Sequence, residues 1–509
     1  MKVQIIIAFV VVFAITSCSK SLDVPPETTL SSATFFKTES DFKQAVNAAY
    51  VPLRSIVNDR AWVLGEMHSD NTYYYRNILF GNTENYENVA DFSIPTANGI
   101  TTNSNVLNQY RLDYQIIART NQILAQIDNG DFDAVSKADL KGQALFLRAY
   151  AYFELVRYFG KVPLHLTPVT NRSEAALPLS SSDSIYAQII KDATEASQSL
   201  LPKSAQEAGR ATSGAAKTLL ANVYIEQKKW AEAETLLRDI VNSNEYSLMP
   251  DYNDVFSTST TNKNNAESVF EVQFMEGSGG YSGNFLYNFL PQPMTATELQ
   301  AITGVSNPQA LSGAGASGEG NNAPTPDIIA AYEPEDKRKE ASIAYVTLSG
   351  SLRENKVYPY IKKYAKIHAL YNNTGINWPV YRYAEVLLFL GEVLNEQGKG
   401  SEAVTYVNQV RDRAFGTGVS SITTTSQPEL RDIIFRERRV ELAFENKRWF
   451  DLVRSGKAVE VITAYGNRVK SHPEDYYYPA GTVPPNNAFT NIDLVYGLPA
   501  DEAALNPNF

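Results

Sequence analysis

Ten residues of this chain combine aromatic rings with polar side chains in segments of poor periodicity, and together they could form a sugar-binding surface. They are Trp62, Asp70, Asn71, Tyr73, Tyr74, Tyr75, Arg76, Tyr281, Tyr287 and Trp378. The C–H groups on a sugar face stack on aromatic rings, while its hydroxyls bond to Asp, Asn and Arg. The pattern therefore predicts carbohydrate-binding loops. The alternative is that about half of these rings anchor their own loops to the body of the protein.

Catalytic chemistry has weaker support in the sequence. The four histidines, His68, His165, His368 and His472, lie far apart with no metal-binding spacing, and a G-x-S-x-G nucleophile motif is absent. We therefore expect no catalytic residue, no metal and no other cofactor. Two alternatives stay open: a glycoside hydrolase whose paired carboxylates come from distant segments, and a Ca²⁺ ion held by loop oxygens.

Residues 313–318 (GAGASG) match the dinucleotide-binding pattern G-x-G-x-x-G. Such a motif works only where a strand precedes it and a helix N-terminus follows to hold the pyrophosphate. An apolar strand does not precede these residues, and the polar sequence EGNNAPTP follows. We interpret them as a flexible surface loop.

The beginning of the chain has the pattern of an exported lipoprotein. Residues 1–17 carry one Lys and an apolar run over 5–15 that is too short for a permanent membrane span, which predicts a signal peptide. Cys18, the only cysteine, follows directly, so we expect it to be lipidated and residues 18–32 to form a Pro- and Ser-rich tether. The net charge of the 509 residues is −11 with both signs interspersed, which argues against a nucleic-acid partner.

The elements that must position these residues are mainly helices, and the best organised stretch is 426–456. Ser426 and Glu429 predict a capping box, Asn446 predicts a left-handed break into two helices, and Gly456 predicts the end. Glu437 and Glu441 fall within an apolar stripe surrounded by arginines. We expect a buried, paired structural network in preference to a catalytic cluster.

The remaining periodicity predicts a predominantly α fold with two tetratricopeptide-like hairpins and a long insertion. Residues 226–233 align without a gap with 396–403, so 211–242 and 381–414 are expected to form similar hairpins. Further helices are predicted from residue 40 and over 105–128, 139–160 and 185–201, and short strands over 269–274, 343–348 and 357–361.

One segment, 435–458 (FRERRVELAFENKRWFDLVRSGKA), resembles the C-terminal hallmark of the SusD/RagB family of outer-membrane nutrient-binding lipoproteins. Six more blocks lie along the chain in the family's order: LDVPP at 22–26, the aromatic helix with Tyr110, Tyr114, Ile117 and Asn121, the segments 139–163, 211–242 and 381–414, and the closing block at 494–509. In the closing block, Gly497 and Leu498 replace the family's usual Pro-Ile, which leaves the packing of the tail open.

The resemblance implies a cell-surface lipoprotein of the outer membrane that binds an oligosaccharide or similar nutrient and delivers it to a SusC-like TonB-dependent transporter. It also implies one domain, 33–509, with a helical scaffold over about 33–246 and 380–465 and a ligand-binding insertion over about 247–379. Residues 62–99 and the insertion are then expected to line one face. A peptide ligand and a tetratricopeptide-type scaffold for a protein partner remain alternatives.

Overall fold

The computed structural model describes residues 35–58, 62–75, 84–94, 100–257, 259, 263–309, 320–348 and 355–509. The predicted signal peptide, the tether with Cys18, Arg76 and the glycine-rich residues 313–318 lie outside the described residues.

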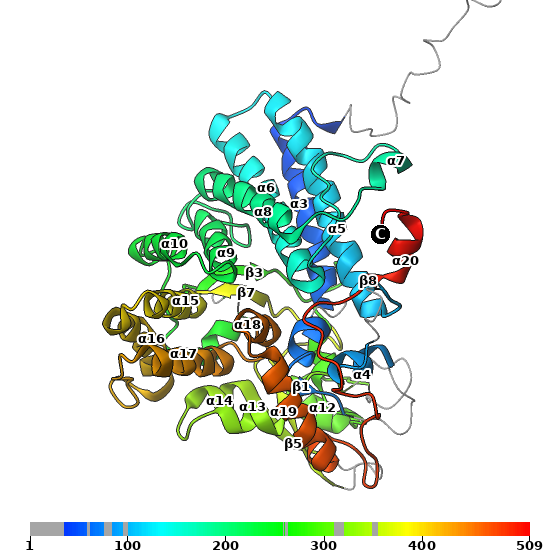
Figure 1. Ribbon diagram of the computed structural model, residues 1–509, viewed down its shortest axis with the longest axis vertical. Helices are drawn as coiled ribbons and strands as arrows, with labels where there is room; N and C mark the ends of the chain where they lie inside the picture. The colour runs from blue at the N-terminus through cyan, green and yellow to red at the C-terminus, as the bar shows by residue number, and fades with distance from the viewer. Residues whose placement is uncertain are drawn as a thin grey trace, which may run out of the picture.

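Four long helices form the upper part of the molecule in Figure 1: α3 (Glu39–Asn58), α5 (Ser104–Gln126), α6 (Ala134–Phe159) and α8 (Ser182–Ser199). Polar side chains begin three of them, because Asn103, Asp133 and Ser181 accept hydrogen bonds from backbone N–H groups of the first turn. The cap at Asp133 explains why α6 begins earlier than the periodicity predicted. Gly160 ends α6 with a φ of +71°, a backbone conformation that favours glycine.

Two helical hairpins continue this layer: α9 (Ser213–Glu226) with α10 (Trp230–Asn242), and α15 (Tyr383–Glu396) with α16 (Gly400–Phe415). Helix α10 packs on α15, so the hairpins stack although the insertion separates them in sequence (Figure 1). The helices α15 and α16 approach closely at Gly391, where an added Cβ would lie 2.9 Å from a methyl group of Val407. The predicted predominantly α, tetratricopeptide-like fold is confirmed.

The insertion is closed at its base by two antiparallel strands, β3 (Ser268–Val272) and β7 (Trp378–Arg382). A second antiparallel pair, β5 (Ile343–Thr347) and β6 (Val357–Ile361), confirms the two strands predicted there. The insertion also contains η3 (Tyr252–Phe256), α11 (Phe285–Phe289), α12 (Ala296–Thr303), α13 (Pro326–Ala331) and α14 (Lys337–Ser342).

The segment between α3 and α5 is more regular than its composition predicted. It contains η1 (Val63–Met67), β1 (Thr72–Tyr73) and α4 (Glu84–Ala90). Strand β1 pairs antiparallel with β4 (Ala323–Pro324) of the insertion, so these two parts of the chain do lie together. The shorter helices elsewhere are η2 (Ile127–Asn129), α7 (Arg172–Ala175), α18 (Arg448–Arg454), α19 (Ala458–Ser471) and η4 (Pro473–Tyr476).

The 426–456 stretch divides as predicted but begins differently. Helix α17 (Gln427–Glu441) is followed by a break in which Asn446 has a φ of +61°, and Gly456 has a φ of +73° after α18. These two predictions are confirmed. The capping box is wrong: the Ser426 side chain makes no capping hydrogen bond, and the Glu429 carboxylate accepts from the Thr424 hydroxyl at 2.6 Å instead.

The C-terminal tail packs against the upper helices. Strand β8 (Leu498–Pro499) pairs in parallel with β2 (Ile100–Thr101), and α20 (Ala500–Leu505) follows it. The Asn506 side chain donates to the Leu177 carbonyl at 2.8 Å, and Arg111 forms an ion pair with Glu502 at 2.6 Å. The tail is therefore ordered despite its departure from the usual Pro-Ile sequence.

Across the described part of the chain, every helix is too short or too polar to cross a bilayer.

Candidate functional site

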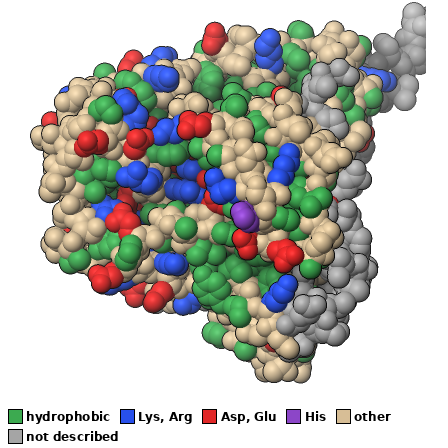
Figure 2. All heavy atoms as spheres, turned by 60° about the horizontal axis from the view of Figure 1, so that its bottom comes forward, with side chains coloured by type: hydrophobic (Ala, Val, Ile, Leu, Met, Phe, Trp, Pro, Cys, Tyr) green, Lys and Arg blue, Asp and Glu red, His purple; other side chains and the backbone are tan. Residues whose placement is uncertain are grey.

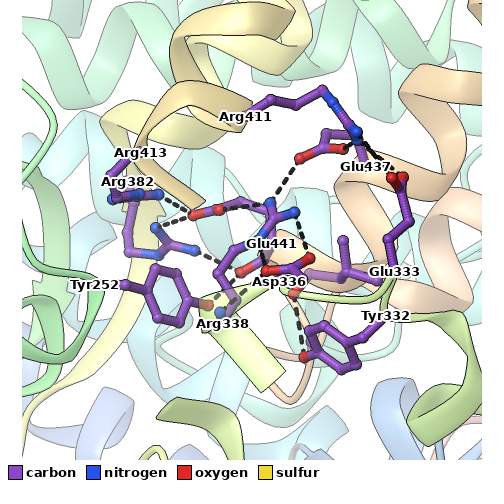
Figure 3. Close-up of polar contacts among 12 residues, drawn as sticks. Tyr252, Tyr332, Glu333, Asp336, Arg338, Arg382, Arg411, Arg413, Glu437 and Glu441 are labelled. Carbon is purple, nitrogen blue, oxygen red and sulfur yellow. Dashed lines mark hydrogen bonds and ion pairs between the residues drawn. The ribbon is translucent and has the colours of Figure 1, made fainter. Parts of the chain in front are cut away.

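A buried ionic network surrounds the carboxylates of α17, and Figure 3 shows several arginines directed toward them. Glu441 accepts from Arg413 at 2.5 Å, from Arg382 at 2.9 Å and from Arg338 at 3.1 Å. Burial by itself would raise the pKa of the Glu441 carboxyl, but the three guanidinium groups outweigh it and hold the pKa well below its ordinary range. The carboxylate is therefore ionised and fully paired.

Glu437 extends the same network. Its two oxygens accept from Arg338 and from Arg411, each at 2.6 Å, and Arg338 is also held by Asp336 at 2.7 Å. Helix α14, strand β7 and helix α16 are thus joined to α17 through charges that are almost completely removed from solvent. The prediction of a buried, paired network is confirmed. Such a network fixes the insertion on the scaffold and offers no accessible carboxylate to a substrate.

Two predicted ligand contacts, Asp70 and Asn71, belong to a second buried network. The Asp70 carboxylate lies 2.8 Å from Arg448 and 2.9 Å from Arg439. Burial opposes ionisation of Asp70, but these arginines lower its pKa to about 2. Asn71 accepts from Arg439 at 2.8 Å and donates to Glu66 at 2.9 Å. Both polar groups bind α17 and its surroundings, so their prediction as ligand contacts is wrong for this structure.

The consecutive tyrosines predicted to face the ligand are also buried. The exposed fractions of Tyr73, Tyr74 and Tyr75 are 0%, 3% and 2%. The hydroxyls of Tyr73 and Tyr74 both donate to Asp91, and that of Tyr75 donates to the Pro359 carbonyl. Burial and the neighbouring Asp91 raise the pKa of Tyr73. The stretch 73–75 is therefore packed on both sides, where its polarity had suggested an open loop.

Three further candidates are core residues. Trp62 contacts Phe289 edge to face at 4.8 Å between ring centroids, and Trp378 stacks on Tyr364 at 5.1 Å. Tyr287 is fully buried, and its hydroxyl lies 2.7 Å from Nε2 of His368. These rings, like those of residues 73–75, anchor their segments in the core. The prediction that they stack on a ligand is therefore wrong for this structure. Arg76 lies outside the described residues.

Tyr281 differs from the other candidates, because 47% of its surface is exposed. Its ring lines a groove of about 430 Å³ between α3, β3 and residues 207–210, and the Arg54 guanidinium lies over it at 5.0 Å from the ring centroid. The loop that carries Tyr281 is held in place by α3, since Asn58 donates to the Ser282 carbonyl at 3.1 Å and accepts from the Asn284 N–H at 3.1 Å.

Polar side chains that the sequence analysis did not identify form the rim of this Tyr281 groove. Arg210 donates to Asn47 and to Gln143, each at 2.9 Å, and pairs with Glu207 at 2.6 Å. Gly209 has a φ of +88°, and an added Cβ would lie 2.7 Å from Gln273, so glycine lets this loop approach the residue that follows β3. Asn47 and Arg54 occupy the polar face of an amphipathic helix, where their types carry no special signal.

The groove therefore offers an exposed ring, a stacked guanidinium and preorganised amide and guanidinium donors. These are groups that bind a sugar face and its hydroxyls.

On the face drawn in Figure 2, Lys and Arg intermingle with Asp and Glu, without the continuous basic stripe that nucleic acid requires. Within the described ranges, three or more His, Cys, Asp or Glu side chains do not gather as a metal site would need.

Comparison with known proteins places this chain among relatives of the same fold and length. The model described as "SusD family" matches residues 336–508, and the model described as "Starch-binding associating with outer membrane" matches residues 20–225. SusD-like protein P25 of Formosa agariphila is 26% identical over an alignment that covers 100% of this chain and 98% of the relative.

Two solved structures extend this likeness to the whole fold. A SusD superfamily protein from Bacteroides vulgatus superposes with a TM-score of 0.72 at 25% identity and covers 93% of this chain and 98% of its own. A laminarin-binding SusD-like protein superposes with a TM-score of 0.70 at 23% identity over 92% and 98%. Since both family models and the complete fold agree, this chain belongs to the SusD/RagB family.

Proposed function

We propose that this protein is a cell-surface lipoprotein that binds an oligosaccharide and delivers it to a SusC-like TonB-dependent transporter of the outer membrane. The observation that carries the proposal is membership of the SusD/RagB family, supported at both ends of the chain and over the complete fold. Carbohydrate binding agrees with the description of the N-terminal family model as starch-binding and with the laminarin-binding structural neighbour.

The Tyr281 groove is the proposed contact surface for the sugar. A sugar ring would stack on Tyr281 beside Arg54, while Asn47 and Arg210 are placed to bond to its hydroxyls. Stacking of a nucleic-acid base on an aromatic side chain contributes about 1 to 3 kcal/mol, and by analogy a sugar would contribute near the lower value. A single exposed ring therefore favours modest affinity for each sugar unit.

Binding is proposed without hydrolysis. The α17 carboxylates Glu437 and Glu441 are buried and paired with arginines, so neither is accessible to a glycosidic oxygen. Cys18 and residues 19–32 are proposed to hold the body at the membrane, since a lipidated cysteine would supply the anchor that the described helices lack.

The proposal is tested with a glycan array probed by purified residues 19–509, including α- and β-glucan oligosaccharides, with a peptide array in parallel. We expect retention of one glycan class and recovery of the glycan unchanged after prolonged incubation. Release of shorter products, with loss of that release on replacing one carboxylate, would establish a hydrolase instead. Binding to peptides alone would overturn the carbohydrate proposal.

Delivery to a transporter needs a separate measurement. An affinity tag on this protein should retain a TonB-dependent barrel from detergent-solubilised outer membranes of the producing cell. A matched Tyr281→Ala variant should retain the same barrel, because Tyr281 is assigned to the sugar. Failure of the wild-type protein to retain any barrel would contradict the delivery step while leaving sugar binding intact.

A further inference from the structure

A second cavity lies on the side of α5 that faces α7 and α20, toward the C-terminus in Figure 1. Its volume is about 610 Å³, within the range of pockets that bind small molecules. It shares no lining residue with the Tyr281 groove. Its apolar wall consists of Tyr110, Tyr114, Ile117, Pro163, Val169, Leu505 and Phe509.

The walls of this α5–α20 pocket are held by hydrogen bonds between distant segments. The Tyr114 hydroxyl donates to the Pro163 carbonyl at 2.6 Å, and Asn121 donates to the His165 carbonyl at 3.0 Å. On the opposite wall, Asn506 donates to the Leu177 carbonyl. The pocket is therefore formed before any ligand enters, which reduces the entropy lost on binding.

The charge at the pocket is positive. Arg119 and Arg172 both line it, and neither forms an ion pair with a carboxylate of the described residues; Arg119 donates only to the Ala48 carbonyl. The Glu502 carboxylate forms an ion pair with Arg111 at 2.6 Å. His165 adds no charge near neutral pH, because burial lowers its pKa. Two arginines that have no anionic partner among the described residues thus line an apolar chamber.

We infer that the α5–α20 pocket binds a small carboxylate with an aromatic or aliphatic body. The body would occupy the apolar wall formed by Tyr114, Ile117 and Phe509, and the carboxylate would accept from Arg119 and Arg172. A guanidinium presents two parallel N–H donors that match a carboxylate. A neutral sugar fits this site less well, since most of the wall is apolar and a sugar presents hydroxyls on every edge.

The probe is 4-phenylbutyrate, and the matched neutral probe is 4-phenylbutan-1-ol, each titrated by calorimetry into the purified full chain. We expect the acid to bind at least tenfold more tightly than the alcohol. Arg172→Gln should weaken binding of the acid about threefold or more and leave the alcohol unaffected. Arg172 is exposed on a four-residue helix, so this change should not impair folding.

A steric variant tests the location. Ala118 is an exposed residue of α5 that lines the pocket, so Ala118→Trp should obstruct it and weaken both probes at least tenfold with an unchanged melting temperature. Tyr281→Ala is the control and should bind 4-phenylbutyrate normally, while Ala118→Trp should bind glycan normally. Equal affinity for acid and alcohol, or binding of the acid unaffected by Ala118→Trp, would overturn the inference, whether or not the glycan proposal holds.

Discussion

The Arg382 guanidinium lies 2.9 Å from the Glu441 carboxylate, and this contact joins β7, the strand that closes the insertion, to helix α17. Arg382 is the last residue of β7, and Glu441 is the last residue of α17. The position of each element therefore depends on a contact with the other and not on local sequence alone. The Tyr252 hydroxyl also donates to the Glu441 carbonyl at 2.6 Å. The network around Glu441 therefore determines how the insertion lies on the helical body.

Removing the Glu441 carboxylate should destabilise the protein strongly. Glu441→Ala leaves three buried arginines with fewer partners, and we expect the free energy of unfolding to fall by about 3 to 5 kcal/mol in denaturant titrations. Glu396→Ala is the control, because Glu396 pairs with the largely exposed Arg431 and should cost less than about 1 kcal/mol. Equal effects would contradict the network's role.

Stability should fall at acid pH through Asp70 and Asp451. Burial disfavours ionisation of both, but Arg448 and Arg439 at Asp70, and Arg438 and Arg454 at Asp451, lower each pKa to about 2. Because the unfolded pKa is about 3.9, each carboxylate stabilises the fold above that pH, and the contribution is lost as the pH falls toward 2.

The measurement is the free energy of unfolding between pH 6 and pH 2. Asp70→Asn should reduce stability at pH 6 by more than it does at pH 2, so its curve should approach the wild-type curve in acid. The exposed Asp128 supplies the control, since Asp128→Asn should leave the free energy of unfolding unchanged at both pH 6 and pH 2. A constant difference for Asp70→Asn at every pH would mean that its ionisation does not contribute.

The Tyr281 groove should supply affinity without supplying stability. Tyr281→Ala removes an exposed ring, so we expect a glycan identified on the array to bind about tenfold more weakly, or about 1.4 kcal/mol, with a nearly unchanged melting temperature. Arg54→Gln should weaken the same glycan. Unchanged calorimetric affinity in both variants would remove this groove from the site.

Tyr74 and Tyr75 should behave in the opposite way. Replacing both by Ala removes two buried rings and their hydrogen bonds, so the free energy of unfolding should fall by more than about 3 kcal/mol. Tyr345→Ala, at an exposed tyrosine, is the matched control and should change stability little. A stable double variant that has lost glycan affinity would restore these tyrosines to the binding site.

Anchoring is tested at Cys18. Cys18→Ala removes the predicted acyl chains, and the sequence that follows has no apolar run long enough to span a bilayer and no basic cluster to replace them, so the variant should leave the membrane fraction. Fractionation in cells lacking the transporter checks this, with Ser19→Ala as the control. Retention of the Cys18→Ala variant in membranes would contradict lipidation.

The sequence by itself determined the class of fold and most of its elements. Periods of 3.6 residues identified the helices of both hairpins, because this pattern reflects which side chains an isolated helix must bury, and short strand-like runs identified β5 and β6. Asn446 and Gly456 marked the ends of helices because left-handed backbone is a local property. The charges of α17 predicted pairing, since unpaired charge is costly to bury.

Only the tertiary structure decided which aromatic residues could meet a ligand. Tyr74 and Tyr281 both stand in polar, irregular sequence, yet 3% of the first and 47% of the second is exposed. The difference arises because the Tyr74 hydroxyl forms hydrogen bonds with Asp91 and Tyr478, whereas the Tyr281 ring contacts the Arg54 guanidinium at the edge of a groove. Such partners come from segments far apart in the chain, and exposure depends on where those segments pack, which no local pattern of residues specifies.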